Sequence, residues 1–326
     1  MSQDDRTKLI DVRVSKRTVE AVDICSYELV DIGGAPLPAF SAGAHVDVHG
    51  PTGIVRQYSL CSPENDTSRY QIAVLKDPAS RGGSVAMHEG VAEGNMLKIS
   101  LPRNHFSLDA HATHSILVAG GIGVTPIMSM VESLARAGAS FELHYCCRTL
   151  EKTAFWPYLN GFAEKGSVHL HLDQGPAEQR ANFDAIFGAA PAGSHLFMCG
   201  PQGFLNHVGD AAKRAGWESE RIHFELFAAA VDADAQGDAF TVKVASTGKT
   251  YLIPGVTLAE STALAQQGVE IPVSCEQGIC GSCLTGVLEG TPDHRDQYLT
   301  AQEHKENKLM TPCCSRARSS CLVLDI

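Results

Sequence analysis

The sequence lacks any apolar run of the roughly 18 to 20 residues that a membrane-spanning helix needs. It opens with MSQDDRTKLI, which is charged where a secretory signal would be hydrophobic, so we expect a soluble, cytoplasmic protein. Basic residues are not in excess either, because the formal net charge is -11. That charge disfavours attraction to nucleic acid or to an anionic membrane surface. The sequence contains no internal repeat and no low-complexity tract.

The 326 residues are more than one hydrophobic core usually organises, so we expect two or three domains and not a small binding module. Eleven cysteines are the unusual feature of the composition. A cytosolic protein has little use for disulfides, and an odd number of thiols cannot all pair. Metal ligation or redox chemistry is the better explanation. Six of the cysteines crowd the C-terminal region: Cys275, Cys280, Cys283, Cys313, Cys314 and Cys321.

The pattern of apolar and polar residues changes twice along the chain. Residues 9–106 form short alternating runs broken by glycine and proline, which predicts antiparallel strands in a barrel. After residue 114, apolar strands alternate with a glycine turn and amphipathic helices, which predicts a parallel-sheet α/β fold. The stretch AAAVDADAQGD has the composition of a linker. We predict a barrel domain (1–110), an α/β domain (111–228), a linker (229–238) and a C-terminal domain (239–326).

A cysteine-rich loop carries the most specific motif. Cys275, Cys280 and Cys283 have the spacing C-x4-C-x2-C, and Cys313 follows about thirty residues later. This plant-type spacing supplies three thiolates to a [2Fe-2S] cluster from one loop and the fourth from a distant strand. Gly278 in the loop allows backbone N–H groups to turn toward the cluster sulfurs.

Two questions stay open at this motif. Zinc held by four thiolates is the alternative, although zinc sites favour paired C-x2-C knuckles and only one such pair is present. The fourth ligand is also open, because Cys313 and Cys314 are adjacent and Cys321 is near. Successive residues of a strand face opposite ways, so only one of the two neighbours can point at the cluster.

A second motif, R-x-Y-S-L, lies in a predicted barrel strand. Its guanidinium, aromatic ring and hydroxyl can hold the phosphate, ring and N5 edge of a flavin, although an ordinary strand with an exposed arginine would look the same. A glycine-rich turn before a short helix adds an anion-binding nest. The predicted flavin-binding residues are Arg56, Tyr58, Ser59, Val74, Lys76, Arg81, Gly82, Gly83 and Ser84.

A third motif, G-G-x-G-x-T-P, stands between a strand and a helix, where glycines let the backbone approach a pyrophosphate. The strict G-x-G-x-x-G pattern fails, because Pro126 replaces the third glycine and no acidic residue ends the next strand. A buried Cys199 before a tight turn could be simple core. The predicted nucleotide-binding residues are Gly120, Gly121, Gly123, Thr125, Pro126, Arg148, Asp173, Cys199, Gly200, Pro201 and Phe227.

These motifs, with CEQGICGSCLTGVLEG and TPCCSRA, resemble the phthalate dioxygenase reductase family of the ferredoxin-NADP reductase superfamily, which includes vanillate demethylase reductase-like proteins. The likeness covers nearly the whole chain. It implies a multi-domain β and α/β protein with an antiparallel flavin-binding β-barrel that carries FMN. It also implies a parallel-sheet α/β nucleotide-binding domain for NADH. The last implied domain is a C-terminal β-grasp ferredoxin domain with a [2Fe-2S] cluster.

The resemblance also implies roles for single residues. In the family the fourth ligand is the cysteine two residues before Ser-Arg, which is Cys313 here. The string Cys199-Gly200-Pro201 is similar to the family's C-G-P, which lies against the nicotinamide near flavin N5. Phe227 corresponds to the family's aromatic residue near the flavin. Ser59, Cys199 and Phe227 are therefore the residues expected at the hydride-transfer site.

The implied function is that of an NADH-dependent reductase component of a two-component Rieske aromatic-ring oxygenase or demethylase. Electrons would pass from NADH to FMN, to [2Fe-2S] and to a separate Rieske-type oxygenase. An iron–sulfur electron carrier or regulatory module with an inactive flavin half is the alternative, and a zinc-stabilised interaction protein is a third possibility. An acidic docking rim around the cluster loop, or else a mixed solvated face, is expected from Asp293, Asp296, Glu303 and Glu306.

Overall fold

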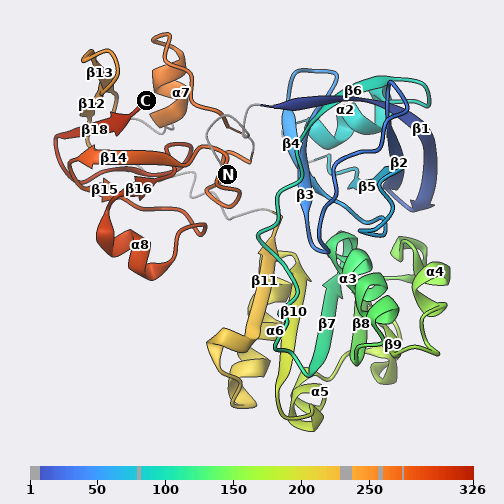
Figure 1. Cartoon of the computed structure of the whole chain (residues 1–326). Coiled ribbons are helices and arrows are strands. Elements are labelled where there is room, and N and C mark those ends of the chain that lie inside the picture. Colours follow the sequence, from blue (N-terminus) through green and yellow to red (C-terminus); the bar gives the residue numbers. More distant parts are fainter. Residues whose placement is uncertain (1–7, 79–81, 228–236, 256–259, 274) are drawn as a thin grey trace. The chain divides into compact units, whose positions relative to one another are not determined.

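The computed structural model describes residues 8–78, 82–227, 237–255, 260–273 and 275–326 (Figure 1). The chain forms two compact units, Met1–Phe227 and Ala228–Ile326. The expected linker, residues 229–238, lies almost entirely outside the described residues, and the finer domain limits remain predictions. Within the described residues, no helix combines the length and apolar character needed to cross a bilayer.

The first unit begins with a six-stranded antiparallel sheet whose strand order is β4-β3-β6-β1-β2-β5. The N–H of Cys61, just beyond β4, donates to the carbonyl of Gln71 in β5 at 2.8 Å, which brings the two edges together as in a barrel. The strands and the helix beside them are β1 (Leu9–Ala21), β2 (Ile24–Asp31), β3 (His45–His49), β4 (Val55–Ser59), β5 (Tyr70–Leu75), α2 (Gly83–Gly90) and β6 (Met96–Ser100).

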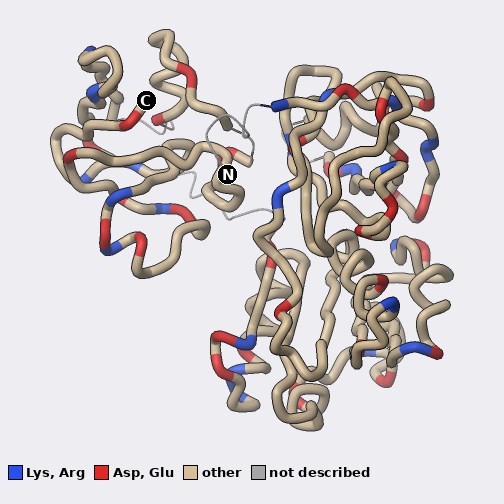
Figure 2. Tube along the Cα trace, in the orientation of Figure 1, with Lys and Arg blue, Asp and Glu red and all other residues tan. Residues whose placement is uncertain are grey.

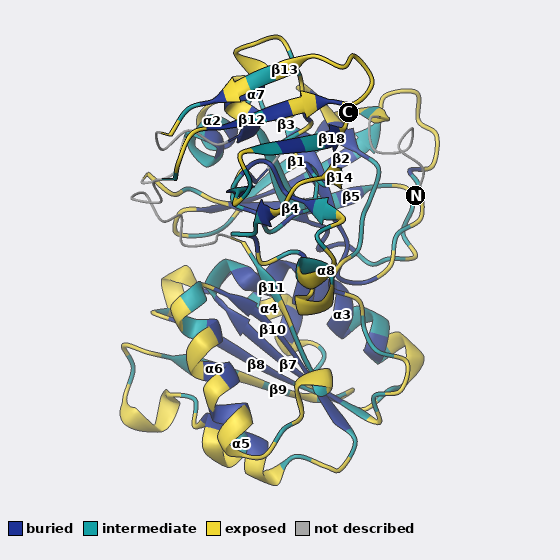
Figure 3. Cartoon of the chain, turned by 90° about the vertical axis from the view of Figure 1, so that its left-hand side faces the viewer, coloured by how far each residue is buried: buried dark blue, intermediate teal, exposed yellow. Residues whose placement is uncertain are grey.

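The rest of the first unit is a five-stranded parallel sheet in the order β11-β10-β7-β8-β9. Its strands are largely buried, whereas the outer faces of the helices are exposed (Figure 3). The strands are β7 (His114–Gly120), β8 (Phe141–Cys147), β9 (Ser167–Leu172), β10 (Ser194–Gly200) and β11 (Ile222–Leu226). The helices are α3 (Val124–Ala137), α4 (Trp156–Asn160), α5 (Phe183–Ala189) and α6 (Gln202–Arg214), with short 3-10 turns at η1 (Gly121–Gly123), η2 (Leu150–Lys152), η3 (Ala177–Gln179) and η4 (Ser219–Arg221).

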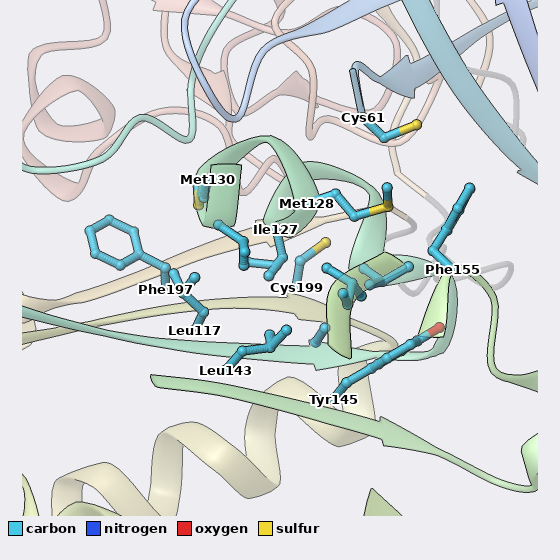
Figure 4. Packing of buried hydrophobic residues seen from close by; sticks show 14 of the residues in the cluster. Cys61, Leu117, Ile127, Met128, Met130, Leu143, Tyr145, Phe155, Phe197 and Cys199 are labelled. Atoms are coloured by element: carbon cyan, nitrogen blue, oxygen red, sulfur yellow. The ribbon is translucent and has the colours of Figure 1, made fainter. Parts of the chain in front are cut away.

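One continuous hydrophobic core joins the antiparallel and parallel sheets of this unit. Cys61, from the barrel, belongs to the same buried cluster as Met128 of α3 and Cys199 of β10. Figure 4 shows Ile127 and Met128 lying between Cys61 on one side and Leu117 of β7 on the other. Because this packing is shared, the ends of the barrel strands and of the parallel strands are held in a fixed relation.

The second unit has a five-stranded mixed sheet in the order β13-β12-β18-β14-β16, in which only β12 and β18 run parallel. Helix α7 packs on this sheet through Ala263 and Leu264. The elements are β12 (Phe240–Val244), β13 (Thr250–Ile253), α7 (Glu260–Ala265), β14 (Thr285–Glu289), β15 (Pro292–Asp293), α8 (Ala301–Glu306), β16 (Leu309–Met310), β17 (Arg316–Ala317) and β18 (Cys321–Asp325). The predicted fold class, a barrel, a parallel α/β domain and a β-grasp ferredoxin domain, is confirmed.

One local expectation is wrong. Cys313 and Cys314 lie in a turn between β16 and β17, not on a strand ladder. Pro312 precedes them and has no N–H to donate to a ladder. Strand alternation therefore does not select one of the two cysteines, and the side-chain contacts decide instead.

A stacked histidine array lies on β8 and β9 of the first unit. Nδ1 of His144 is 2.9 Å from Nε2 of His171, and the ring of His169 stacks on His144 with centroids 4.9 Å apart. Burial, reinforced by these two neighbouring rings, lowers the pKa of His144 to about 3. His144 is therefore neutral in the folded protein at any pH near neutrality.

This array makes the first unit sensitive to acid. An unfolded chain takes up a proton at His144 near pH 6.5, whereas the folded chain does not, so the free energy of unfolding falls by about 1 kcal/mol per pH unit below that value. His144→Phe should remove this component of the pH dependence. Both tryptophans, Trp156 and Trp217, belong to the first unit, so tryptophan fluorescence during urea unfolding at pH 7.5 and 5.5 reports on it alone.

The matched control is His207→Gln, because His207 is exposed on α6 and its replacement should leave the pH dependence unchanged. A His144→Phe protein that loses as much stability between pH 7.5 and 5.5 as the parent would contradict the assignment.

Candidate functional site

Two glycine-containing turns meet at the carboxyl ends of β7 and β10. A Cβ atom on Gly123 would overlap the carbonyl oxygen of Cys199 and lie 2.7 Å from the nitrogen of Gly200. A Cβ on Gly200 would lie 3.1 Å from the Cα of Gly120. The G-G-x-G and C-G-P strings are therefore packed backbone against backbone, which requires glycine at both turns.

The remaining residues of these strings continue the same edge of the sheet. Gly121 lies in η1, and Thr125 and Pro126 are in the first turn of α3. The hydroxyl of Thr125 donates to the carbonyl of Ile122 at 3.1 Å, which ties the turn to the start of the helix. Pro201 precedes α6. A helix that begins at a glycine turn offers its amino terminus to an anion such as a pyrophosphate.

The end of barrel strand β4 meets the end of β11. The hydroxyl of Ser59 donates to Oε2 of Glu225 at 3.3 Å, and Nδ1 of His45 lies 3.7 Å from Oε1 of the same carboxylate. Cys199 is paired with Glu225 in the β10–β11 register. Ser59, Cys199 and Glu225 thus come together from three strands of two sheets.

Electrostatics at this point keep the thiol neutral. Burial, reinforced by the Glu225 carboxylate, raises the pKa of Cys199 well above its ordinary value. The Cys199 side chain is fully buried. It is therefore a small apolar group with a weak S–H donor and not a thiolate nucleophile.

An anion-binding corner lies at the other end of β4. Gly82 has φ of 89° at the N-cap of α2, and a Cβ on Gly83 would lie 3.0 Å from Cγ of Arg56. The guanidinium stem of Arg56 is thus packed on the first turn of α2, whose N–H groups have no acceptor within the helix. This arrangement fits a phosphate group. Arg81, which is also predicted to bind this phosphate, lies outside the described residues.

Four other predicted flavin residues lie near this corner in different settings. Ser84 accepts the backbone N–H of Asp77 at 3.1 Å, and Tyr58 is half-buried, which raises its pKa. Val74 is buried in the barrel core, and Lys76 pairs with Glu89 at 2.9 Å. Their assignment to a cofactor site stays a prediction.

The remaining predicted nucleotide residues follow strands at the same sheet edge. Arg148 and Asp173 are exposed directly after β8 and β9, and the Asp173 N–H donates to Cys147 at 2.9 Å. The backbones at Arg148 and Asp173 are therefore adjacent. The order of the strands in the sheet sets how far both lie from the glycine turns. Phe227 follows β11 and is 38% exposed, so its ring is available to pack against a bound group.

In the second unit, four thiols converge from the loop and from the turn. Cys275 interacts with Cys280 and Cys313, and Cys313 interacts in turn with Cys283. All four are buried. The N–H of Gln277 donates to Sγ of Cys275 at 3.3 Å, which is the kind of bond that tunes a cluster's potential. Four buried thiols with backbone donors fit a [2Fe-2S] cluster.

The two other cysteines of this region have different partners. Sγ of Cys314 lies 3.3 Å from Oγ1 of Thr311 and 3.9 Å from Oγ of Ser315, and its contact with the Cys313 thiol lowers its pKa to about 7. Cys321 is half-buried on β18, where its thiol points to the carbonyl of Leu322. Cys313, which bridges Cys275 and Cys283, is better placed as the fourth ligand.

Comparison with known proteins agrees with this architecture. A family model described as a 2Fe-2S iron-sulfur cluster binding domain matches residues 242–318. The vanillate O-demethylase oxidoreductase of Pseudomonas sp. is 48% identical over 318 residues, covering 98% of this chain and all of that relative. The phthalate dioxygenase reductase of Burkholderia cepacia is 40% identical over 316 residues, covering 97% of each chain.

A solved structure of a phthalate dioxygenase reductase superposes with a TM-score of 0.74 at 38% identity and covers 98% of both chains. That protein is described as a modular structure for electron transfer from pyridine nucleotides to [2Fe-2S]. Fold and site together define a flavin and iron–sulfur oxidoreductase. The chain belongs to the phthalate dioxygenase reductase family, and it is the reductase component of an oxygenase system. The matches over the full length do not favour the alternatives of an inactive flavin half or a zinc protein.

Sequence reasoning missed two residues of the site. Glu225 and His45 were not selected, yet both lie beside Ser59. Glu225 stands two residues before the selected Phe227 in the string FELF, which was the only signal available. No local pattern in the sequence marked His45, because its partner Glu225 is 180 positions away in the chain.

The adjacent pair Cys313 and Cys314 permits a matched test of the cluster ligands. Cys313→Ser should abolish the cluster, because it removes the thiol that contacts both Cys275 and Cys283. Cys314→Ser should retain it, since a hydroxyl can keep the contacts to Thr311 and Ser315. Iron content and the visible spectrum measure the outcome. Loss of iron from Cys314→Ser together with its retention in Cys313→Ser would show that the fourth ligand is Cys314.

Proposed function

We propose that this chain is the NADH-dependent reductase component of a two-component Rieske aromatic-ring oxygenase or demethylase, with FMN and one [2Fe-2S] cluster as its cofactors. The observation that carries this is the bond between Ser59 and Glu225, which joins the flavin-type strand to the nicotinamide-type strands beside Cys199. It supports one site at which a nicotinamide and a flavin ring could meet.

The residues around that bond have positioning roles in this proposal. Glu225 orients the Ser59 hydroxyl, and the protonated thiol of Cys199 would offer a bound nicotinamide a small apolar surface without competing as a nucleophile. Bound FMN would supply the chemistry of hydride acceptance from NADH and of single-electron release to the iron–sulfur cluster. Phe227, exposed after β11, would shield the flavin ring from water.

FMN is preferred because Arg56 and the first turn of α2 offer several donors to one phosphate. Two exposed residues bear on the choice between NADH and NADPH. Asp173 can accept a ribose hydroxyl of NADH, whereas Arg148 could instead bind the 2′-phosphate of NADPH. We propose NADH, as in the family. We also propose a cytoplasmic location, a reducing compartment that suits cluster thiolates and cysteines that form no disulfide in the described structure.

The partner is proposed to be a Rieske-type oxygenase that docks near the cluster loop. The expected acidic rim is largely absent, because the Asp296 side chain is fully buried and Asp293 pairs with Arg295 at 2.9 Å and Arg318 at 3.2 Å. Glu303 is engaged in the capping box of α8. Figure 2 shows acidic and basic residues interspersed along this segment. The mixed solvated face is the better description.

The flavin assignment has a direct test. Flavin released by heat should migrate as FMN on chromatography, and FAD would refute the choice. Gly83→Val should release most of the flavin, because the added side chain would occupy the space between α2 and Arg56. Gly188→Val is the control, since a Cβ on Gly188 in α5 meets nothing within 4 Å. Full flavin occupancy in Gly83→Val would show that the flavin phosphate does not bind at the first turn of α2.

The partner assignment is tested by stopped-flow oxidation of the NADH-reduced protein by a candidate Rieske oxygenase. We expect transfer with weak dependence on ionic strength, because most carboxylates near the loop are already paired within the chain. The Cys313→Ser variant should still oxidise NADH but fail to reduce the oxygenase, whereas Cys314→Ser should behave as the parent. Efficient transfer to another acceptor with none to any Rieske oxygenase would remove the partner assignment.

A further inference from the structure

The second unit contains a group of imidazole and carboxylate side chains that includes none of the predicted cluster ligands. Nδ1 of His294 lies 3.7 Å from Oδ1 of Asp296, and Nε2 of His304 lies 3.2 Å from Oδ2 of the same carboxylate. The three potential ligand atoms lie within 4.8 Å of one another. The two imidazole rings stack with centroids 4.4 Å apart, so both present a nitrogen to Asp296 from one side.

The orientation of His294 leaves a lone pair facing this carboxylate. Nε2 of His294 lies 3.1 Å from Oδ1 of Asn307, and the Asn307 amide is oriented by its N–H bond to the carbonyl of Lys305. Nε2 is therefore the protonated nitrogen, and Nδ1 carries the lone pair. In the described part of the chain, Nδ1 makes no hydrogen bond, although the side chain is only 9% exposed.

The basic groups nearest the Asp296 carboxylate are the two imidazoles, with a hydrogen bond of 3.2 Å between Nε2 of His304 and Oδ2. The carboxylate is fully buried and accepts the N–H of Leu299 at 2.8 Å, with Oγ of Ser315 3.5 Å away. Among the described residues, no lysine or arginine forms an ion pair with Asp296, and the neighbouring Arg295 pairs with Asp293. A buried carboxylate facing a lone pair is unfavourable unless a cation lies between them.

We propose that His294, Asp296 and His304 form a binding site for a divalent transition-metal ion with a preference for nitrogen and oxygen ligands, such as Zn²⁺. Zinc bonds of about 2.0 to 2.1 Å in a tetrahedron place neighbouring ligand atoms roughly 3.3 Å apart. The separations, 3.7 Å from Nδ1 of His294 to Oδ1 and 3.2 Å from Nε2 of His304 to Oδ2, are close to that value, and one ion would take either oxygen of the carboxylate. Three protein ligands leave a fourth position for water.

The surroundings have the features of a metal site. Asn307 accepts the Nε2–H of His294, and the N–H of Leu299 holds one oxygen of Asp296, as outer-shell partners of metal ligands do. His304 is 29% exposed, which provides a path for the ion. The site adjoins the cysteine loop, because the N–H of Gln297 donates to the carbonyl of Gly278 at 3.0 Å.

A second group, Asp109, His195 and His223 in the first unit, has similar composition but satisfied nitrogens. Nδ1 of His195 bonds to Nε2 of His223 at 3.0 Å, and Asp109 accepts the N–H of His111. A cation would therefore stabilise this group less than it would stabilise the group around Asp296. It serves as the matched control for the proposed site.

The test is a calorimetric titration of the holoprotein with Zn²⁺, with the visible spectrum recorded to verify that flavin and cluster are intact. We expect one saturable ion per chain. His304→Ala should weaken binding by about tenfold or more, because it removes one ligand, and Asp296→Asn should do the same while preserving the size of the side chain. His223→Ala should bind Zn²⁺ as the parent does.

Three results would overturn the proposal: no saturable binding to the parent, parent-like affinity in His304→Ala, or loss of binding in His223→Ala alone. If His304→Ala loses the cluster spectrum, Asp296→Asn and His294→Gln decide instead. Unchanged affinity in either of these two, with the cluster spectrum intact, would also overturn it.

Discussion

The contact between two backbone turns in the first unit is the constraint on which the nucleotide and flavin chemistry depends. Gly123 lies so close to Cys199 that no side chain fits between them. This contact fixes the ends of β7 and β10, and the shared core that contains Cys61 and Met128 fixes the barrel against them. Ser59 can reach Glu225 only because both constraints hold, so the site depends on tertiary packing more than on any single motif.

The iron–sulfur loop depends on a comparable close approach. Gly278 has φ of 69°, and a Cβ there would lie 2.8 Å from Cβ of Asp296. The buried carboxylate of Asp296 thus lies against the loop that carries Cys275 and Cys280. The conformation of the thiol loop and the histidine group around Asp296 therefore share one packing contact, although their ligand chemistry differs.

The sequence predicted the features that depend on local spacing. The C-x4-C-x2-C loop, the glycine turns and the fold class with three kinds of sheet follow from short patterns. Contacts between distant segments did not follow, since nothing in the string around His45 or Glu225 indicates that Ser59 lies beside them. Asp296 was expected on an acidic rim, because its neighbours in the chain are charged, yet its side chain is buried. Burial is set by tertiary packing, which a charge run does not report.

We infer that electrons from NADH reach the iron–sulfur cluster through a flavin in this one chain. An anaerobic titration of the purified protein with NADH, followed by its visible spectrum, tests it most directly. The flavin and iron–sulfur absorbance should both bleach, with an end point at about 1.5 NADH per chain, because the flavin takes two electrons and the cluster one. A titration that reduces the flavin and leaves the iron–sulfur absorbance unchanged would contradict the account.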